Sequence, residues 1–205
     1  MTIIYFRLTD SCNDVVGRVG GVTQLDNVLY VACYNKIRTL AADTLRPLVN
    51  IDVKGMIDPR DIVVCRDDRQ LYVADYGSLW RVSVDDHSYV KWLSNESTTH
   101  TFDALSVTSR RLLVTSWWWP SPRLRQYSMT DRQLLRVVEL PQYVREVWHG
   151  VETTRGTFVV GHRGTSQDEE QCAVSELFSF VVSSRAYECG NLDIQLSCLF
   201  STMVF

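Results

Sequence analysis

The sequence lacks the features that define several large classes of protein. Lys and Arg number 21 against 24 Asp and Glu, so there is no overall basic excess of the kind that dedicated nucleic-acid-binding proteins carry. No apolar run approaches the ~20 residues of a membrane-spanning helix. The opening residues are too short, and lack the basic start, for a signal peptide, so we expect a cytoplasmic chain with reduced thiols.

The motifs of common catalytic and cofactor sites are also missing. The six cysteines form no CxxC pair, so a zinc site is not expected. There is no glycine-rich phosphate loop, no nucleophile elbow and no HExxH motif. Helix signals are nearly absent, because neither a long 3.6-residue periodicity nor a capping box ahead of an apolar run occurs. The sequence therefore predicts no cofactor and no metal, and it favours an all-β fold.

What the sequence does contain is an internal repeat. Four segments share one pattern, in which an apolar strand, a short polar turn and a second apolar strand follow one another. The second strands are predicted to start at Leu29, Leu71, Leu112 and Thr157, which gives spacings of 42, 41 and 45 residues. A period of about 40–50 residues, with two further candidate strands in the unit, is typical of the four-stranded blades of a β-propeller.

The repeat divides the chain into three parts. Residues 1–19 look like the last two strands of an earlier blade, residues 20–180 hold four blades, and residues 181–205 form a divergent tail. We therefore expect an incomplete propeller of about four blades plus a half blade. The alternative is a compact closure that uses the N-terminal strands. Because an open arc exposes an edge strand and a blade face, we expect the isolated chain to be marginally stable and to self-associate.

The second unit carries a family resemblance. Its segments Asp58–Cys65, Leu71–Asp75 and Leu79–Val82 resemble an NHL-type repeat, in which a proline-led first strand precedes a second strand that ends in Asp. Other residues take the position of this Asp in the remaining units: Cys33, Ser116 and His162. The resemblance implies missing blades, since NHL propellers usually have six, and it implies protein or RNA binding, as in tripartite-motif proteins. No RING, B-box or coiled-coil segment is present, so it implies no ubiquitin-ligase activity.

One face of the predicted propeller is rich in Trp, Tyr and Arg. Loops between the second and third strands share this face with the connections between blades, which places on it Tyr34, Lys36, Asp58, Arg60, Tyr76, Trp117, Trp118, Trp119, Arg123, Tyr143, Arg145, Trp148 and His149. Trp and Arg are enriched in binding hot spots. We predict a binding site made of Trp117, Trp118, Trp119, Arg123, Tyr143, Arg145, Trp148 and His149. The alternative is that one or two of the adjacent Trp residues only cap the blade core.

Three functions compete for this face. The first is a non-catalytic scaffold that binds a protein or peptide. The second is RNA binding by a basic, Trp-rich surface that uses Arg123, Arg125, Arg136 and Arg145. The least favoured is a metal-dependent hydrolase of the gluconolactonase type, in which His149 and His162 would act with Asp58 or Asp103. The strands nearest the axis are expected to supply only apolar or hydroxyl side chains, which argues against this hydrolase.

Two further residue types receive structural interpretations. Asp75 is expected to bond the backbone N–H groups of the turn that follows it, residues 76–78. Cys33 and Cys65 lie within apolar strands and are expected to act as small core residues.

Overall fold

The computed structural model describes residues 19–94, 101–108, 110–116, 123–141, 144–163 and 172–177. All regular elements in these ranges are β-strands. The predicted partial blade at residues 1–19 and the predicted tail at residues 181–205 lie, apart from Val19, outside the described residues. None of the described residues belongs to a helix that is long and apolar enough to cross a membrane.

The strands form four antiparallel sheets, here numbered as blades 1 to 4. Blade 1 consists of β1 (Val19–Leu25), β2 (Val28–Cys33), β3 (Lys36–Ala41) and β4 (Ile51–Asp52). Blade 2 consists of β5 (Asp61–Cys65), β6 (Gln70–Asp75), β7 (Ser78–Ser83) and β8 (Tyr89–Ser94). Blade 3 consists of β9 (Ala104–Thr108), β10 (Arg111–Ser116), β11 (Arg123–Ser128) and β12 (Leu134–Glu139). Blade 4 consists of β13 (Arg145–Glu152), β14 (Phe158–Arg163) and β15 (Cys172–Leu177).

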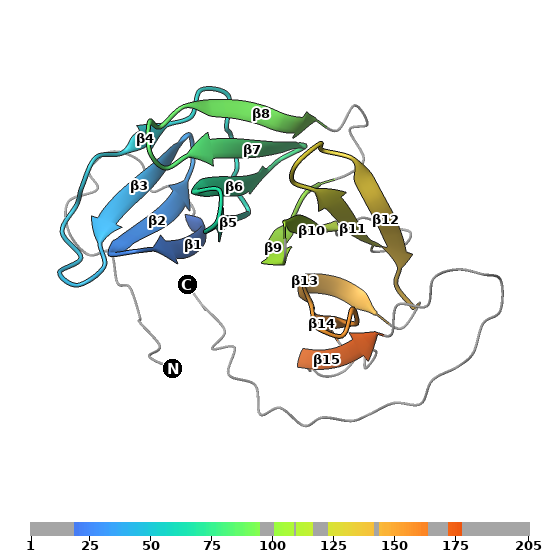
Figure 1. Cartoon of the computed structure of the whole chain (residues 1–205). Coiled ribbons are helices and arrows are strands. Elements are labelled where there is room, and N and C mark those ends of the chain that lie inside the picture. Colours follow the sequence, from blue (N-terminus) through green and yellow to red (C-terminus); the bar gives the residue numbers. More distant parts are fainter. Residues whose placement is uncertain are drawn as a thin grey trace.

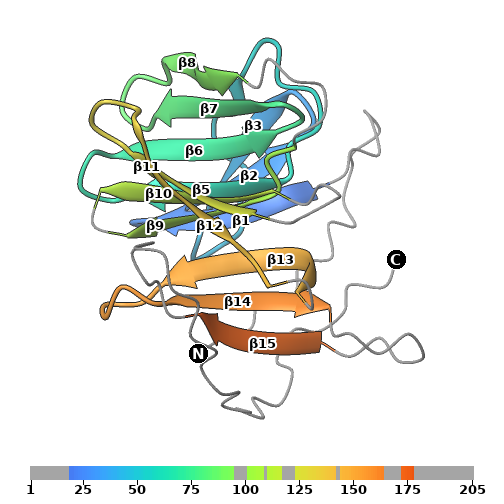
Figure 2. The same cartoon turned by 90° about the vertical axis from the view of Figure 1, so that its right-hand side faces the viewer.

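Within each blade the strands pair in the order in which they occur along the chain. Figure 1 shows the four sheets arranged around a common centre, with the first strand of each blade innermost. The view turned by 90° shows blade 4 below the other three (Figure 2). The innermost strands pack against one another in sequence, β1 on β5, β5 on β9 and β9 on β13. This up-and-down arrangement around an axis is a β-propeller.

The turns between strands repeat a local backbone feature. In the turns between the first and second strands, left-handed backbone occurs at Asp26, Arg69, Arg110 and Gly156. The turns between the third and fourth strands have it at Leu45, His87 and Arg132. Non-glycine residues adopt this conformation at a cost, so it persists where the flanking strands fix the turn.

The core lies between the blades. Alternation along β6 sends Leu71 and Val73 toward blade 1 and Tyr72 and Ala74 toward blade 3, and all four side chains are at most 1% exposed. A third cluster joins blade 3 to blade 4, and Phe158 is fully buried in it. Burial of one such apolar side chain contributes about 1.5–3 kcal/mol, so the blade interfaces hold the fold together.

The predicted starts of the second strands lie within one residue of the observed starts in all four units. Leu29, Leu71 and Leu112 are each the second residue of their strand and are buried. In blade 4 the predicted start, Thr157, lies one residue before β14, which begins at Phe158. The side chain of Phe158 packs toward the preceding blade as those of Leu71 and Leu112 do. Thr153 and Thr157 hydroxyls bond each other at 2.7 Å, which places Thr157 in the turn.

Candidate functional site

The top face of the propeller is the end that carries the turns between second and third strands and the connections between blades. Three exposed apolar side chains lie on the described residues of these segments. Tyr34 follows β2 directly and is 52% exposed, and Tyr76 follows β6 in the same way and is 57% exposed. Ile57, on the connection from blade 1 to blade 2, is 61% exposed. The repeat thus brings together aromatic residues that are 42 positions apart in the sequence.

Trp148 adds a fourth exposed apolar side chain near this end of β13. The register of β13 on β14 steps from Val147 opposite His162 to His149 opposite Gly161, so Trp148 is the extra residue of a β-bulge. Bulges re-aim side chains and are common beside functional sites. Trp148 is 47% exposed, and the sequence predicted it as a binding residue.

A ring of equivalent positions surrounds the axis at the same end. Each second strand has a buried Leu or Phe near its start, and the residue three positions later pairs with the innermost strand of the same blade. The four residues of the innermost strands that pair at this position are Gly21, Asp61, Ala104 and His149. Two of the four are small, and the other two are titratable. The expectation that axial strands carry only apolar or hydroxyl side chains was therefore wrong. The strand register places Asp61 and His149 in this ring, at the top end of the propeller axis.

Asp61 links three blades. Its Oδ2 accepts the N–H of Leu105 on blade 3 at 2.8 Å, and its Oδ1 accepts the N–H of Ile62 at 2.8 Å. A Cβ on Gly21 of blade 1 would lie 2.7 Å from the same Oδ1, so only glycine fits there without displacement. Burial raises the pKa of Asp61, while the two N–H donors and the charge of His149 act in the opposite direction.

Asp75 has a structural role, although its partners differ from the predicted ones. Its carboxylate accepts the N–H of Asp58 at 2.7 Å, the N–H of Ile57 at 3.2 Å and the indole N–H of Trp80 at 3.2 Å. The predicted partners in residues 76–78 were wrong, because the carboxylate, which is buried, points to the connection between blades instead of the next turn. Asp75 therefore fixes the segment that presents Ile57 on the top face.

The predicted binding residues divide into two groups. Trp117, Trp118, Trp119 and Tyr143 lie outside the described residues, and only the backbone of Arg145 is described. The structure places the remaining three, Arg123, Trp148 and His149, near the top ends of their strands. Tyr76 and Tyr34 belong to the same face, as the sequence predicted, whereas Ile57 and Asp61 were missed. The proline-led strand start at residues 59–61 is the one sequence signal that could have indicated Asp61.

Three of the four arginines that the RNA-binding hypothesis needs already have partners. Arg123 pairs with Glu139 at 3.1 Å, and Arg125 donates to Ser116 Oγ at 3.0 Å. Arg136 lies over the ring of Phe158 and donates to Gln126 and to the carboxylate of Glu152. The contacts of Arg136 join blade 3 to blade 4, whereas those of Arg123 and Arg125 lie within blade 3. All of these contacts reduce the number of arginines available to phosphates.

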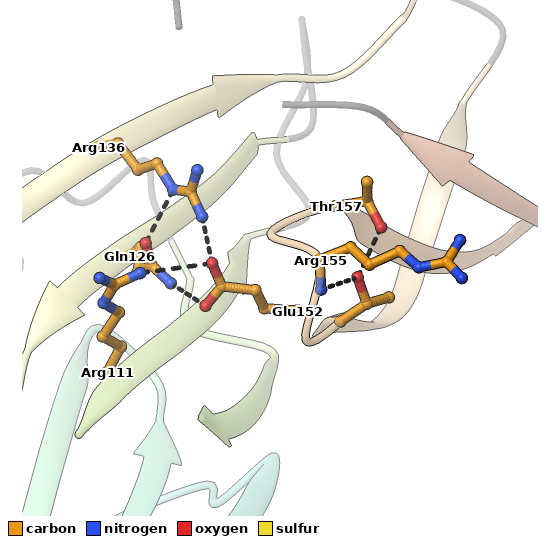
Figure 3. Close-up of polar contacts among 7 residues, drawn as sticks. Arg111, Gln126, Arg136, Glu152, Arg155 and Thr157 are labelled. Atoms are coloured by element: carbon orange, nitrogen blue, oxygen red, sulfur yellow. Dashed lines mark hydrogen bonds and ion pairs between the residues drawn. The ribbon is translucent and has the colours of Figure 1, made fainter. Parts of the chain in front are cut away.

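Figure 3 shows the polar cluster that involves Arg136. The side chain of Glu152, on β13, is 5% exposed and accepts from Gln126 Nε2 at 2.6 Å as well as from Arg136. The guanidinium of Arg111 lies 3.5 Å from the same carboxylate. The cluster joins blade 3 to blade 4 at the end away from the top face.

A cavity of about 540 Å³ also opens at that opposite end, beside blade 2. It is lined mainly by polar residues, with Tyr72, Arg81 and Asp86 from blade 2 and Met129 from blade 3. Asp86 accepts from the N–H and the hydroxyl of Ser88, and bonds to Ser83 and Ser88 lower its pKa to about 2. The carboxylate of Asp86 therefore stabilises the turn between β7 and β8.

No group of three or more His, Cys, Asp or Glu side chains among the described residues could hold a metal ion. His162 is 2% exposed, so the two histidines that the hydrolase hypothesis combines differ in accessibility. Cys33 and Cys65 are buried free thiols, as predicted.

Solved β-propellers resemble this chain. The WD40 domain of Neurospora crassa Pan2 matches with 13% identity and a TM-score of 0.58, over 77% of this chain and 48% of that one. The WD40 propeller domain of Doa1 matches with 14% identity and a TM-score of 0.56, over 70% of this chain and 47% of that one. A chain of a nidogen/laminin complex matches with 14% identity and a TM-score of 0.55, over 78% of this chain and 60% of that one.

The chain thus spans about half the length of the two WD40 chains. No family model and no curated protein sequence matches it. Likeness at this identity concerns the fold, and it agrees with the strand order and the packing of the innermost strands. The chain therefore has an all-β, β-propeller fold, and its described residues form three four-stranded blades and one of three strands.

Proposed function

We propose that this chain is a non-catalytic propeller scaffold that binds a protein or peptide on its top face. The observation that carries the proposal is the set of four apolar side chains exposed at that end, Tyr34, Ile57, Tyr76 and Trp148, each 47–61% exposed. Aromatic side chains supply large contact areas and are enriched at protein interfaces. Exposed apolar groups that gather on one face mark interaction sites more often than single scattered ones do.

Backbone conformation supports the same proposal. Tyr34 has a φ of 40°, in the left-handed region that aromatic residues rarely adopt, although the equivalent turn of blade 2 gives this conformation to Gly77. Strain of this kind is often retained at functional sites. The likeness to a chain of a nidogen/laminin complex is in accord with a protein partner. We further propose that the repeat is of NHL type, on the basis of the pattern around Asp75.

Peptide selection tests the proposal. A phage-displayed random peptide library is panned on the immobilised chain, and the affinities of selected peptides are measured by calorimetry. We expect the double variant Tyr34→Ser/Tyr76→Ser to weaken binding by about tenfold or more, because hot-spot aromatics carry most of an interface's energy. The matched control is Leu134→Ser/Leu135→Ser, which removes two side chains of similar exposure from the outer strand β12.

Two results would count against the proposal. One is a library from which no specific peptide emerges. The other is a set of peptides whose affinity responds to the β12 control as strongly as to the top-face variant.

A further inference from the structure

The ring of Gly21, Asp61, Ala104 and His149 at the top end of the axis is here called the axial mouth, and in it one carboxylate has small neighbours. In the ring of equivalent positions, Gly21 and Ala104 flank Asp61 on the adjacent blades, and His149 completes the ring from blade 4. A side chain at Gly21 would strike the Asp61 carboxylate, so the absence of bulk beside this carboxylate is a requirement of the packing. Asp61 itself is of intermediate exposure and is not fully buried.

The charge of Asp61 is not balanced by an ion pair among the described residues. It accepts hydrogen bonds from two neutral backbone donors, the N–H groups of Ile62 and Leu105, and the charge of His149 acts on it as well. Arg60, the residue before Asp61, already pairs with Asp58 at 2.7 Å. Each carboxylate oxygen accepts more than one hydrogen bond, so Asp61 retains acceptor capacity.

Exposed apolar side chains lie on the segments beside Asp61. Trp148 precedes His149 in the bulge of β13, and Ile57 and Tyr76 are exposed on the neighbouring segments of blade 2. A cation on an apolar stem is the ligand group that suits a partly buried negative charge with aromatic and aliphatic side chains nearby. Arginine meets both requirements better than lysine does, because its guanidinium is less strongly hydrated and packs against aromatic faces.

We propose that the axial mouth receives an arginine side chain of the bound protein or peptide, with Asp61 as the acceptor of its guanidinium. The inference rests on the proposed function, since it names the partner group that the top face takes. It assigns Asp61 a binding role in addition to its bonds between blades, and it predicts that ligands of this face carry an arginine at their point of deepest contact.

The test uses L-arginine amide as the probe and L-citrulline amide as its neutral isostere. Each is titrated into the ¹⁵N-labelled chain, and the amide resonances of Ile62 and Leu105 are followed, because these two groups bond Asp61. We expect arginine amide to shift both resonances saturably and citrulline amide to leave them in place. Added salt should weaken the arginine response, because part of the attraction is between charges at a partly exposed site.

Variants then assign the effect to Asp61. Asp61→Asn should weaken the binding of arginine amide by about tenfold or more, because the charge is lost while the side-chain shape is kept. Asp58→Asn is the matched control, since Asp58 is a carboxylate of the same face that already pairs with Arg60, and we expect it to leave the affinity unchanged. The comparison of the two amides in the wild-type chain needs no variant, so it decides the question even if Asp61→Asn does not fold.

Equal shifts with both amides, or an arginine response that survives Asp61→Asn, would overturn the inference. Its failure is distinguishable from failure of the proposed function. Selected peptides without arginine that still depend on Tyr34 and Tyr76 would leave the scaffold function in place and remove the role of Asp61.

Discussion

Two aspartates of the top face, 17 residues apart, show how environment decides what a carboxylate contributes. Asp75 is 1% exposed and accepts two backbone N–H groups and the indole N–H of Trp80. Asp58 has a side chain that is 35% exposed and pairs with Arg60. Loss of the first carboxylate leaves buried donors without acceptors, whereas loss of the second leaves its partner free to turn to water.

We therefore predict that Asp75→Ala lowers the free energy of unfolding by about 3 kcal/mol or more, because several buried donors lose a charged acceptor. Asp58→Ala should cost no more than about 1 kcal/mol. Urea denaturation followed by tryptophan fluorescence measures both. Similar losses for the two variants would show that Asp75 is not a specific support of the connection between blades 1 and 2.

The raised pKa of Asp61 leads to a second prediction at the scale of single residues. Burial raises this pKa, so ionisation of Asp61 opposes folding. The stability that Asp61 contributes is fully present below its unfolded-state pKa and is lost as the pH rises through the folded-state pKa. Thermal melts of the wild-type chain and of Asp61→Asn, recorded between about pH 7 and about pH 4, isolate the effect because the other carboxylates titrate in both.

As the pH falls, the melting temperature of the wild-type chain should therefore improve relative to that of Asp61→Asn. A constant difference across the range, or a change in the opposite direction, would contradict this account of Asp61.

At the scale of elements, the sequence predicted strands better than it predicted contacts. Period-2 alternation and regular spacing located the second and third strands of blade 2 to within one residue, since the predicted segments Leu71–Asp75 and Leu79–Val82 lie within β6 and β7. The spacing could not place Asp61 at the axis, because that depends on which residue of β6 lies opposite it. Nor could local turn chemistry identify the partners of Asp75, which lie 17 and 18 residues earlier in the chain.

Side-chain pairs across the interfaces between blades also could not be predicted from the sequence. Gln126 and Glu152 come from different blades, and neither belongs to a recognisable motif. Gln126 is nevertheless among the largest fully buried side chains, and Glu152 is 5% exposed. A buried carboxylate is retained only when donors surround it, and Arg111, Gln126 and Arg136 provide them.

We predict that Glu152→Ala destabilises the chain by about 2–4 kcal/mol, because the variant leaves the Gln126 amide and the Arg136 guanidinium without their common acceptor. The matched control is Glu139→Ala, which breaks the exposed pair with Arg123 and should cost less than about 1 kcal/mol. Chemical denaturation of the two variants gives the comparison. A loss for Glu152→Ala no larger than that of the control would mean that the cluster contributes little to the packing of blade 4.

At the scale of the whole molecule, the arc has two end faces. In blade 2, Leu71 and Val73 point toward blade 1 and are fully buried. The equivalent residues of blade 1, Leu29 and Val31, point away from blade 2 and are 4% and 5% exposed, although no blade precedes them among the described residues. Val22 lies opposite Val31 on the same face and is 45% exposed. Val22 is thus the apolar side chain that this end face of blade 1 exposes.

This end face leads us to predict that the chain self-associates in solution. Sedimentation velocity over a range of concentrations should show species larger than a monomer, and Val22→Asp should reduce them, because a charge cannot be buried in an apolar contact without a partner. Val137→Asp serves as the control, since Val137 is 41% exposed on the outer strand β12 of blade 3. Removal of residues 181–205 should alter solubility as well, if that segment shares the contact. A wild-type chain that sediments as a clean monomer and melts at high temperature would show that the arc closes by itself and that the end face of blade 1 is already covered.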